Sequence, residues 1–177
     1  MKKLFFLFAM LLGVLSASAG EKVLTLEQGE LATLKAGGNV AVVFNFDGAT
    51  YDMKEPLSAH YTNLAELTAK VPFNFTEGFN DKCKKSKVVD SADAKYTMEI
   101  KVSNMDYFFS AMSFVPGHKT KVWGTATIKD KTTGETVAVI KITECEGDRD
   151  FVADDSFGKC FVKLGEQLAK AFNKGKL

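Results

Sequence analysis

Tyr96-Thr97-Met98-Glu99-Ile100-Lys101-Val102-Ser103 is the stretch of sequence from which the fold class follows. Large apolar side chains alternate in it with polar ones, position by position. Because successive side chains of a β-strand point to opposite faces, this alternation predicts a strand with one buried face and one face in water. The sheet to which it belongs is therefore expected to be covered on one side by other elements.

Two further strands are expected downstream, at residues 121–129 and 136–143, each with apolar side chains at every second position. Residues 130–135 between them form a turn in which Gly134 can take a positive φ. Three consecutive strands joined in this way predict an antiparallel meander. The apolar positions are Val122, Gly124, Ala126 and Ile128 in the first strand and Ala138, Ile140 and Ile142 in the second.

The remaining elements are read from the same kinds of periodicity. Residues 39–47 alternate as a strand, and residues 21–38 predict a short strand or a poorly ordered arm. Residues 57–70 have helical spacing, and Pro72 is expected to end that helix because proline lacks the donor and clashes with the preceding turn. A second helical piece follows it, and residues 156–173 form a last amphipathic helix.

This order of elements predicts the α+β class: one domain with a mixed sheet of four to five strands that ends in the antiparallel meander and is packed by helices. We expect residues 20–177 to form this single domain, a length that suffices for one hydrophobic core. We find no internal repeat and no linker that would divide it.

Residues 1–19 have the pattern of a secretory signal peptide. Lys2 and Lys3 precede an almost unbroken apolar run from Leu4 to Leu15, and small residues follow up to Ala19, where we expect cleavage. The run is shorter than the ~20 residues that span a bilayer, and the mature chain has no apolar run long enough to do so. The protein is therefore expected to be periplasmic or secreted, without a transmembrane segment.

The charge of the mature chain argues against nucleic acid as a partner. Removing Lys2 and Lys3 leaves 21 basic side chains against 22 acidic ones. Such a balance lacks the positive excess by which proteins bind phosphate backbones or anionic membrane surfaces.

The chain has three cysteines, Cys83, Cys145 and Cys160, so at most one internal disulfide can form. We expect it between Cys145 and Cys160, which flank an acidic loop whose closure would stabilise the fold by about 3 kcal/mol in the chain-entropy model. The alternative is three free thiols.

The connection between the first two meander strands, residues 105–117, is rich in Phe and Met, whereas such connections are usually polar. If it protrudes, it forms an exposed apolar patch of the kind that binds partners. In the alternative, the strands extend and these side chains pack on the core. The candidate partner-binding residues are Tyr107, Phe108, Phe109, Met112, Phe114 and Trp123.

Catalytic and metal-binding patterns are weak. A Cys160–His118 pair could supply a thiolate nucleophile, but we expect Cys160 to be buried. The acidic residues between Glu144 and Asp155 match no calcium loop, and we expect them to be solvated and to cap the last helix through Asp154, Asp155 or Ser156. Neither a phosphate-binding Gly-rich loop nor a zinc pattern occurs, so no metal, no cofactor and no enzymatic activity are expected.

Three sequence segments resemble known proteins: residues 40–44, Val-Ala-Val-Val-Phe; residues 93–100, Asp-Ala-Lys-Tyr-Thr-Met-Glu-Ile; and the turn at 130–135. Together with the order of elements, they resemble a group of bacterial envelope domains: the amino-terminal domain of TolB, the curli-secretion lipoproteins and the lipoprotein activators of penicillin-binding proteins. The chain also looks like uncharacterised exported proteins of Bacteroides-type bacteria. Most of those relatives carry a lipid on an N-terminal cysteine, which this chain lacks.

The resemblance implies a periplasmic protein-interaction module and supplies no catalytic residues. We therefore expect an exported module of the bacterial envelope that binds one or more envelope proteins. The alternatives are a carrier of a small apolar ligand, held between the sheet and the helices, and an enzyme with a site that the sequence does not reveal.

Overall fold

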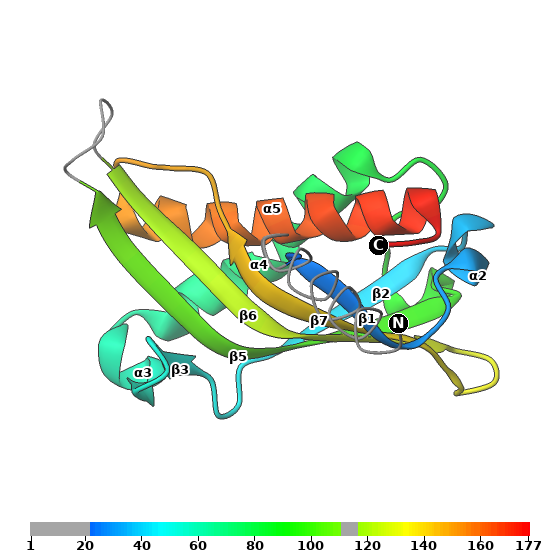
Figure 1. Cartoon of the computed structure of the whole chain (residues 1–177), viewed down its shortest axis with the longest axis horizontal. Helices are drawn as coiled ribbons and strands as arrows, with labels where there is room; N and C mark the ends of the chain where they lie inside the picture. The colour runs from blue at the N-terminus through cyan, green and yellow to red at the C-terminus, as the bar shows by residue number, and fades with distance from the viewer. Residues whose placement is uncertain (1–21, 111–116) are drawn as a thin grey trace, which may run out of the picture.

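One mixed sheet of seven strands organises the computed structural model of the chain, which describes residues 22–110 and 117–177 (Figure 1). A long antiparallel path runs through its centre, and short strands lie at one edge. The order is β1 (Leu24–Gly29), β7 (Thr136–Glu146), β6 (Gly117–Asp130), β5 (Tyr96–Ser110), β3 (Thr50–Tyr51) and β4 (Glu55–Pro56), with β2 (Val40–Asn45) parallel to β5.

The predicted meander is confirmed, and its first two strands are longer than expected. β5 and β6 form one antiparallel ladder that runs from the pair Tyr96–Asp130 to the pair Ser110–Gly117, with one bulge between Val102 and Asn104. Most of the unusual connection that begins at residue 105 is therefore strand. The α+β class and the single domain are also confirmed.

The sheet has more strands than the four to five that we predicted. β1 pairs antiparallel with β7, the two-residue strand β3 pairs with β5, and the two-residue strand β4 pairs with β3. Two-residue strands leave no periodicity in a sequence, so the pattern does not predict β3 and β4. β1 lies in the segment for which we expected a short strand or a poorly ordered arm, and it shows only one buried side chain.

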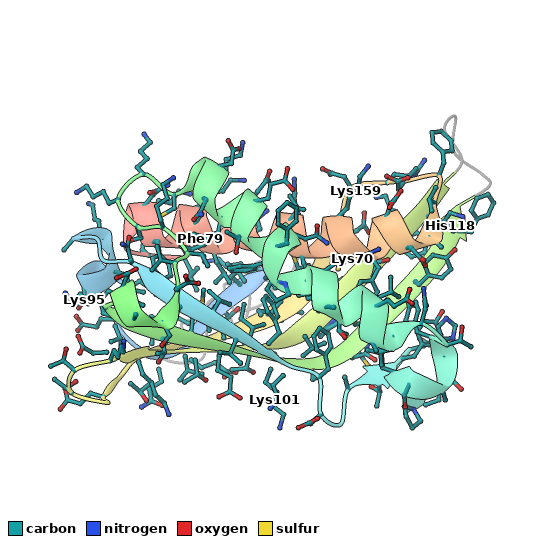
Figure 2. All side chains as sticks on the ribbon, turned by 180° about the vertical axis from the view of Figure 1, so that it is seen from behind. Lys70, Phe79, Lys95, Lys101, His118 and Lys159 are labelled. Atoms are coloured by element: carbon teal, nitrogen blue, oxygen red, sulfur yellow. The ribbon has the colours of Figure 1, made fainter. Side chains whose placement is uncertain are left out.

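Two long helices, α4 (Leu64–Lys82) and α5 (Ala153–Lys174), cover one face of the sheet (Figures 1 and 2). The short helices α2 (Ala32–Lys35) and α3 (Leu57–His60) and the 3-10 turn η1 (Ser91–Asp93) lie at the margins. None of the helices in the described residues is both long and apolar enough to cross a membrane.

The predicted break at Pro72 is wrong. The helical region instead separates after His60, and α4 runs through Pro72 as one helix. Proline removes one backbone hydrogen bond, but Val71, Phe75 and Phe79 of the same helix are fully buried against the core. Burial of three large side chains contributes about 1.5–3 kcal/mol each, which outweighs the ~3 kcal/mol cost of an interior proline.

The core lies between this helical layer and the inward face of the sheet. Tyr96, Met98, Ile100 and Val102 of β5 have essentially no exposed surface. Their polar neighbours Thr97, Glu99, Lys101 and Ser103 face the opposite side, which no helix of the described residues covers. The alternation from which the fold class was predicted therefore sets which face of the sheet the helices occupy.

The helices α4 and α5 cross so closely that only glycine fits at the contact. A Cβ atom on Gly165 would lie 2.4 Å from the carbonyl oxygen of Phe75 and 2.8 Å from the amide nitrogen of Phe79. A Cβ atom on Gly78 would lie 2.0 Å from the carbonyl oxygen of Val162. Backbone atoms cannot yield as side chains do, so these two glycines set the distance between the helices.

Gly165→Ala is therefore expected to destabilise the protein by about 1–3 kcal/mol, although alanine favours helix formation, because the added methyl group overpacks a backbone contact. Gly158→Ala in the same helix is the matched control. Its Cβ atom would meet the end of the flexible Asn74 side chain at 2.6 Å, so its stability should be unchanged or slightly higher. Urea unfolding of both variants measures the difference, and equal stabilities would contradict the tight crossing.

Candidate partner-binding surface

The outer ends of β5 and β6 reach the start of α5, where the helical cover stops (Figure 1). Thr120 of β6 is still fully buried and shares a 2.7 Å hydrogen bond with Ser156, in the first turns of α5. Two residues nearer the end of the hairpin, His118 pairs with Asp150 in the loop that leads into α5. Beyond Thr120, the inward face of the hairpin is therefore flanked by a loop instead of a helix.

Three rings gather on this uncovered part of the inward face. Phe109 and His118 are direct partners across the two strands, with ring centroids 4.9 Å apart. Tyr107 stacks on His118 at 5.1 Å, and its hydroxyl group contacts His118 Nδ1. Burial, and then the Asp154 carboxylate, raises the pKa of Tyr107 above its ordinary value, so its side chain is a neutral phenol at physiological pH.

The loop before α5 carries two more exposed apolar side chains at this end of the molecule. Backbone hydrogen bonds from His118 N to Asp150 O (2.6 Å) and from Asp150 N to His118 O (3.0 Å) hold the loop beside β6. Phe151 and Val152 follow Asp150 directly and are 72% and 52% exposed, while Phe109 is 54% exposed. We call Tyr107, Phe109, His118, Phe151 and Val152 the apolar tip; Figure 2 labels His118 at this end of the molecule.

The opposite face of the same strands is charged. Lys119 pairs with Glu146 and Lys121 with Glu144, and both ion pairs link β6 to β7. The Lys121 ammonium group lies 5.2 Å from the centre of the Phe108 ring, a cation–π contact that covers this side chain. The hairpin end is thus polar on its outward face and apolar on its inward face.

The predicted partner-binding residues divide between these two faces. Tyr107 and Phe109 belong to the apolar tip. Phe108 and the half-buried Trp123 lie on the outward face, where Trp123 is opposite Asn104. Met112 and Phe114 lie outside the described residues.

Sequence reasoning missed His118, Phe151 and Val152 as members of the tip. A signal did exist, since Phe151-Val152 is an apolar pair inside an otherwise acidic loop. What the sequence could not supply was the pairing of Asp150 with His118, which brings that loop to a strand more than thirty positions earlier.

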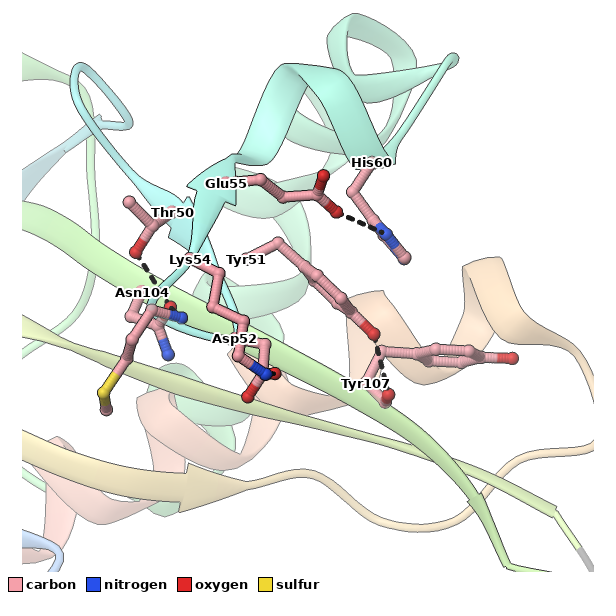
Figure 3. Close-up of polar contacts among 9 residues, drawn as sticks. Thr50, Tyr51, Asp52, Lys54, Glu55, His60, Asn104 and Tyr107 are labelled. Atoms are coloured by element: carbon pink, nitrogen blue, oxygen red, sulfur yellow. Dashed lines mark hydrogen bonds and ion pairs between the residues drawn. The ribbon is translucent and has the colours of Figure 1, made fainter.

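A second aromatic group supports the hairpin from the side of β3 and β4 (Figure 3). The Tyr51 ring stacks on the His60 ring, with the ring centroids 3.4 Å apart. The Tyr51 hydroxyl group donates a 3.1 Å hydrogen bond to the backbone carbonyl of Tyr107. His60 Nδ1 lies 3.5 Å from a carboxylate oxygen of Glu55. Both histidines of the chain therefore lie at this end of the molecule.

Asn104 fixes the turn between β3 and β4. Its buried side-chain oxygen accepts hydrogen bonds from the Met53 amide at 2.7 Å and from the Thr50 hydroxyl at 2.9 Å. Asp52 and Met53 have positive φ values of 49° and 58°, a backbone conformation that costs energy for residues other than glycine. The bonds to Asn104 offset that cost and hold the turn against β5.

The Cys160–His118 arrangement is not formed. Cys160 is fully buried and its thiol donates a 3.2 Å hydrogen bond to the Phe157 carbonyl, whereas His118 contacts Tyr107. Burial, and then the neighbouring Cys145 thiol, raises the pKa of Cys160 well above its usual range, which disfavours a thiolate. Among the residues that the structure describes, no three His, Cys, Asp or Glu side chains are grouped so as to hold a metal ion.

The expected disulfide is also absent from the structure, in which Cys83, Cys145 and Cys160 are buried free thiols. The loop between Cys145 and Cys160 is closed by other contacts instead. Gly147 N donates to Thr120 O at 3.0 Å, Asp150 pairs with His118, and the Asp150 carboxylate forms an ion pair with Lys159. These contacts hold the loop without a covalent bond.

The acidic loop caps α5 differently from the prediction. The helix begins at Ala153 with Val152 as its N-cap residue, and no side chain caps it there. Asp150 Oδ1 accepts a 3.0 Å hydrogen bond from the Val152 amide, and Asp154 accepts one from the Asn63 side chain at 3.0 Å. Asp154 and Asp155 lie in the first turn, where they suit the positive end of the helix.

The solved structures named below are distantly similar to the chain. No protein-family model matches the chain, and no curated protein matches it. Among solved structures, it is similar to the PelC dodecamer of Paraburkholderia phytofirmans at 11% identity and a TM-score of 0.38, over 83% of this chain and 96% of that one. A PelC variant in a second crystal form gives 14% identity and a TM-score of 0.43, over 84% and 98%.

A putative neuraminyllactose-binding hemagglutinin homolog from Helicobacter pylori is similar at 8% identity and a TM-score of 0.38, over 77% of this chain and 83% of that one. Similarities of this size leave the function to be argued from the surface of the chain itself.

Thiol counting tests the state of the cysteines. Burial raises the pKa of Cys145 to about 12, and all three thiols are buried, so we expect the folded mature protein to react with a thiol reagent at pH 8 far more slowly than the unfolded protein. In denaturant without a reductant, three thiols should react per chain. A count of one would show that a disulfide forms after all.

A pair of tyrosine variants tests the support of the hairpin. Tyr51→Phe removes the hydrogen bond to Tyr107 and should cost about 1 kcal/mol of unfolding free energy. Tyr61→Phe is the matched control, because the buried Tyr61 hydroxyl has no hydrogen-bond partner among the described residues and its removal should be neutral or stabilising. Urea unfolding measures both, and a larger loss for Tyr61→Phe would contradict this assignment.

Proposed function

We propose that this protein is an exported protein-interaction module of the bacterial envelope, and that the apolar tip is the surface with which it binds a partner protein. The observation that carries the proposal is the exposure of Phe109, Phe151 and Val152 on two segments of chain that two backbone hydrogen bonds between His118 and Asp150 hold side by side. Exposed apolar side chains that are scattered singly are ordinary, whereas a contiguous group rimmed by polar residues is typical of a binding surface.

The composition of the tip suits protein recognition. Aromatic side chains are enriched in the residues that dominate binding energy, and each phenylalanine that becomes fully buried contributes about 1.5–3 kcal/mol. The backbone under the tip is part of a strand pair supported by Tyr51 and Asn104, so little conformational entropy is lost on binding. The ion pairs of Lys119 and Lys121 on the outward face supply a polar rim.

Export and an envelope location rest on the sequence. The support is the signal-peptide pattern of residues 1–19 and the resemblance of three sequence phrases to envelope domains. On this support we propose a periplasmic or secreted location, with the partner among the proteins of the envelope.

The hollow between the two long helices does not suit the alternative function, a carrier of a small apolar ligand. A hollow of about 470 Å³ between α4 and the start of α5 is lined mainly by charged and amide side chains, among them Lys70, Asp150 and Lys159. A hydrocarbon ligand requires an apolar lining. No observation on the described residues specifically supports an enzymatic site.

The double variant Phe109→Ser/Phe151→Ser tests the proposal. Both side chains are exposed in the free protein, so the unfolding free energy should change by less than about 1 kcal/mol. Capture of partner proteins by chemical crosslinking in cells, followed by mass spectrometry, should fall at least tenfold, since two buried aromatic anchors are lost.

Phe73→Ser is the matched control, because Phe73 is 74% exposed on α4 and does not belong to the tip. It should leave the captured proteins unchanged. Equal capture by the double variant and the control would reject the tip as the binding surface, and unfolding of the double variant would show that these side chains serve the core.

A further inference from the structure

A hollow lined by lysines lies at the end of α5 opposite to the apolar tip. It measures about 250 Å³ and is formed where α2, the loop after α4 and the last turns of α5 meet. Figure 1 shows α2 and the C-terminus together at this end. We call it the lysine pocket, after the five lysines that line it: Lys35, Lys84, Lys85, Lys170 and Lys174.

None of these five ammonium groups has a counter-charge among the residues that the structure describes. No acidic side chain lines the lysine pocket, and none of the five lysines forms an ion pair with a residue that the structure describes. Some lysines elsewhere are paired, for example Lys121 with Glu144 and Lys159 with Asp150. What distinguishes the lysine pocket is that five lysines and no acidic residue line one hollow, in a chain whose overall charge is nearly balanced.

The negative ends of the helix dipoles compensate only part of this positive charge. The C-terminal ends of α2, α4 and α5 all lie at the lysine pocket, and lysines are favourable there. Each full helix end carries about half a negative charge, so three ends offset at most about 1.5 of the five positive charges. An excess of about three and a half remains, enough to balance a phosphate group, which carries roughly −1.5 to −2 at neutral pH.

The wall of the lysine pocket is fixed by Asn173. Its side-chain oxygen accepts a 2.9 Å hydrogen bond from the Lys84 amide, and its side-chain nitrogen donates a 2.8 Å hydrogen bond to the Lys82 carbonyl. The loop that carries Lys84 and Lys85 is thereby fastened to α5. Leu34, Cys83 and Phe172 form a buried floor, so the backbone around the lysines is organised before any ligand arrives.

From this geometry we propose that the lysine pocket binds a phosphate group, either in a free phosphorylated molecule or in the headgroup of an anionic lipid. Ammonium groups bind phosphate as mobile point charges, and several of them around one hollow can contact its oxygens together. The site is separate from the apolar tip, so it stands whether or not the tip binds a partner protein.

Inorganic phosphate and lipid vesicles are the two probes. We expect saturable shifts of the Lys84, Lys85 and Asn173 amide signals in nuclear magnetic resonance spectra of the mature protein as phosphate is added at constant ionic strength. Lys84→Ser/Lys85→Ser should raise the dissociation constant about tenfold, because two of the five ammonium charges are lost. Lys129→Ser/Lys131→Ser is the matched control of equal charge, at two exposed positions at the end of β6 and in the turn that follows, and it should bind phosphate as the unmodified protein does.

The vesicle arm distinguishes the two sources of phosphate. Binding to phosphatidylglycerol vesicles that depends on Lys84 and Lys85, with no saturable effect of inorganic phosphate, assigns the site to a lipid headgroup. Saturable phosphate binding without vesicle binding assigns it to a free phosphorylated molecule. Loss of binding to the same extent in both lysine variants, no binding in either arm, or lysine-dependent dimerisation in place of phosphate binding would each overturn the proposal.

Discussion

The helical layer of this fold covers only one face of its sheet and stops before the sheet does. The strict alternation along β5 leaves a single apolar face, and α4 and α5 pack on that face at a distance set by Gly78 and Gly165. Because α5 begins at Ala153, the last buried polar contact between sheet and helix is Thr120 with Ser156. The strands continue past that point, and the inward face of the hairpin then becomes the apolar tip.

This mismatch in length explains why side chains of the same type have different surroundings along one strand. Met105 is fully buried, Tyr107 is half-buried, and Phe109 is mostly exposed, although all three point toward the same face. The uncovered end is nevertheless held in place, by Tyr51 from one side and by the pairing of His118 with Asp150 from the other. An apolar surface that is exposed and yet held rigidly in place is typical of a binding site, because little conformational entropy is lost on binding.

The two proposed sites lie at opposite ends of α5. Its 22 residues correspond to a length of about 33 Å, so a partner at the apolar tip and a phosphate group at the lysine pocket could be bound together without contact between them. Such an arrangement suits a module that links an anionic surface or molecule of the envelope to a protein.

Much of the fold could be predicted from the sequence, because alternation at residues 96–103, 121–129 and 136–143 is a local property of the chain. The course of α4 through Pro72 could not, since it depends on how much apolar surface its neighbours bury. The site was predicted in part: Tyr107 and Phe109 follow from composition, but which face each residue takes depends on the bulge after Val102.

The central claim is that the apolar tip contacts a partner protein in the cell. A photoreactive amino acid placed at position 109 or 151 of the tagged protein tests it directly, with position 73 on α4 as the reference for an exposed aromatic site outside the tip. The account predicts the same envelope protein crosslinked from positions 109 and 151 and not from position 73. Identical crosslinks from all three positions, or none from the tip, would contradict it.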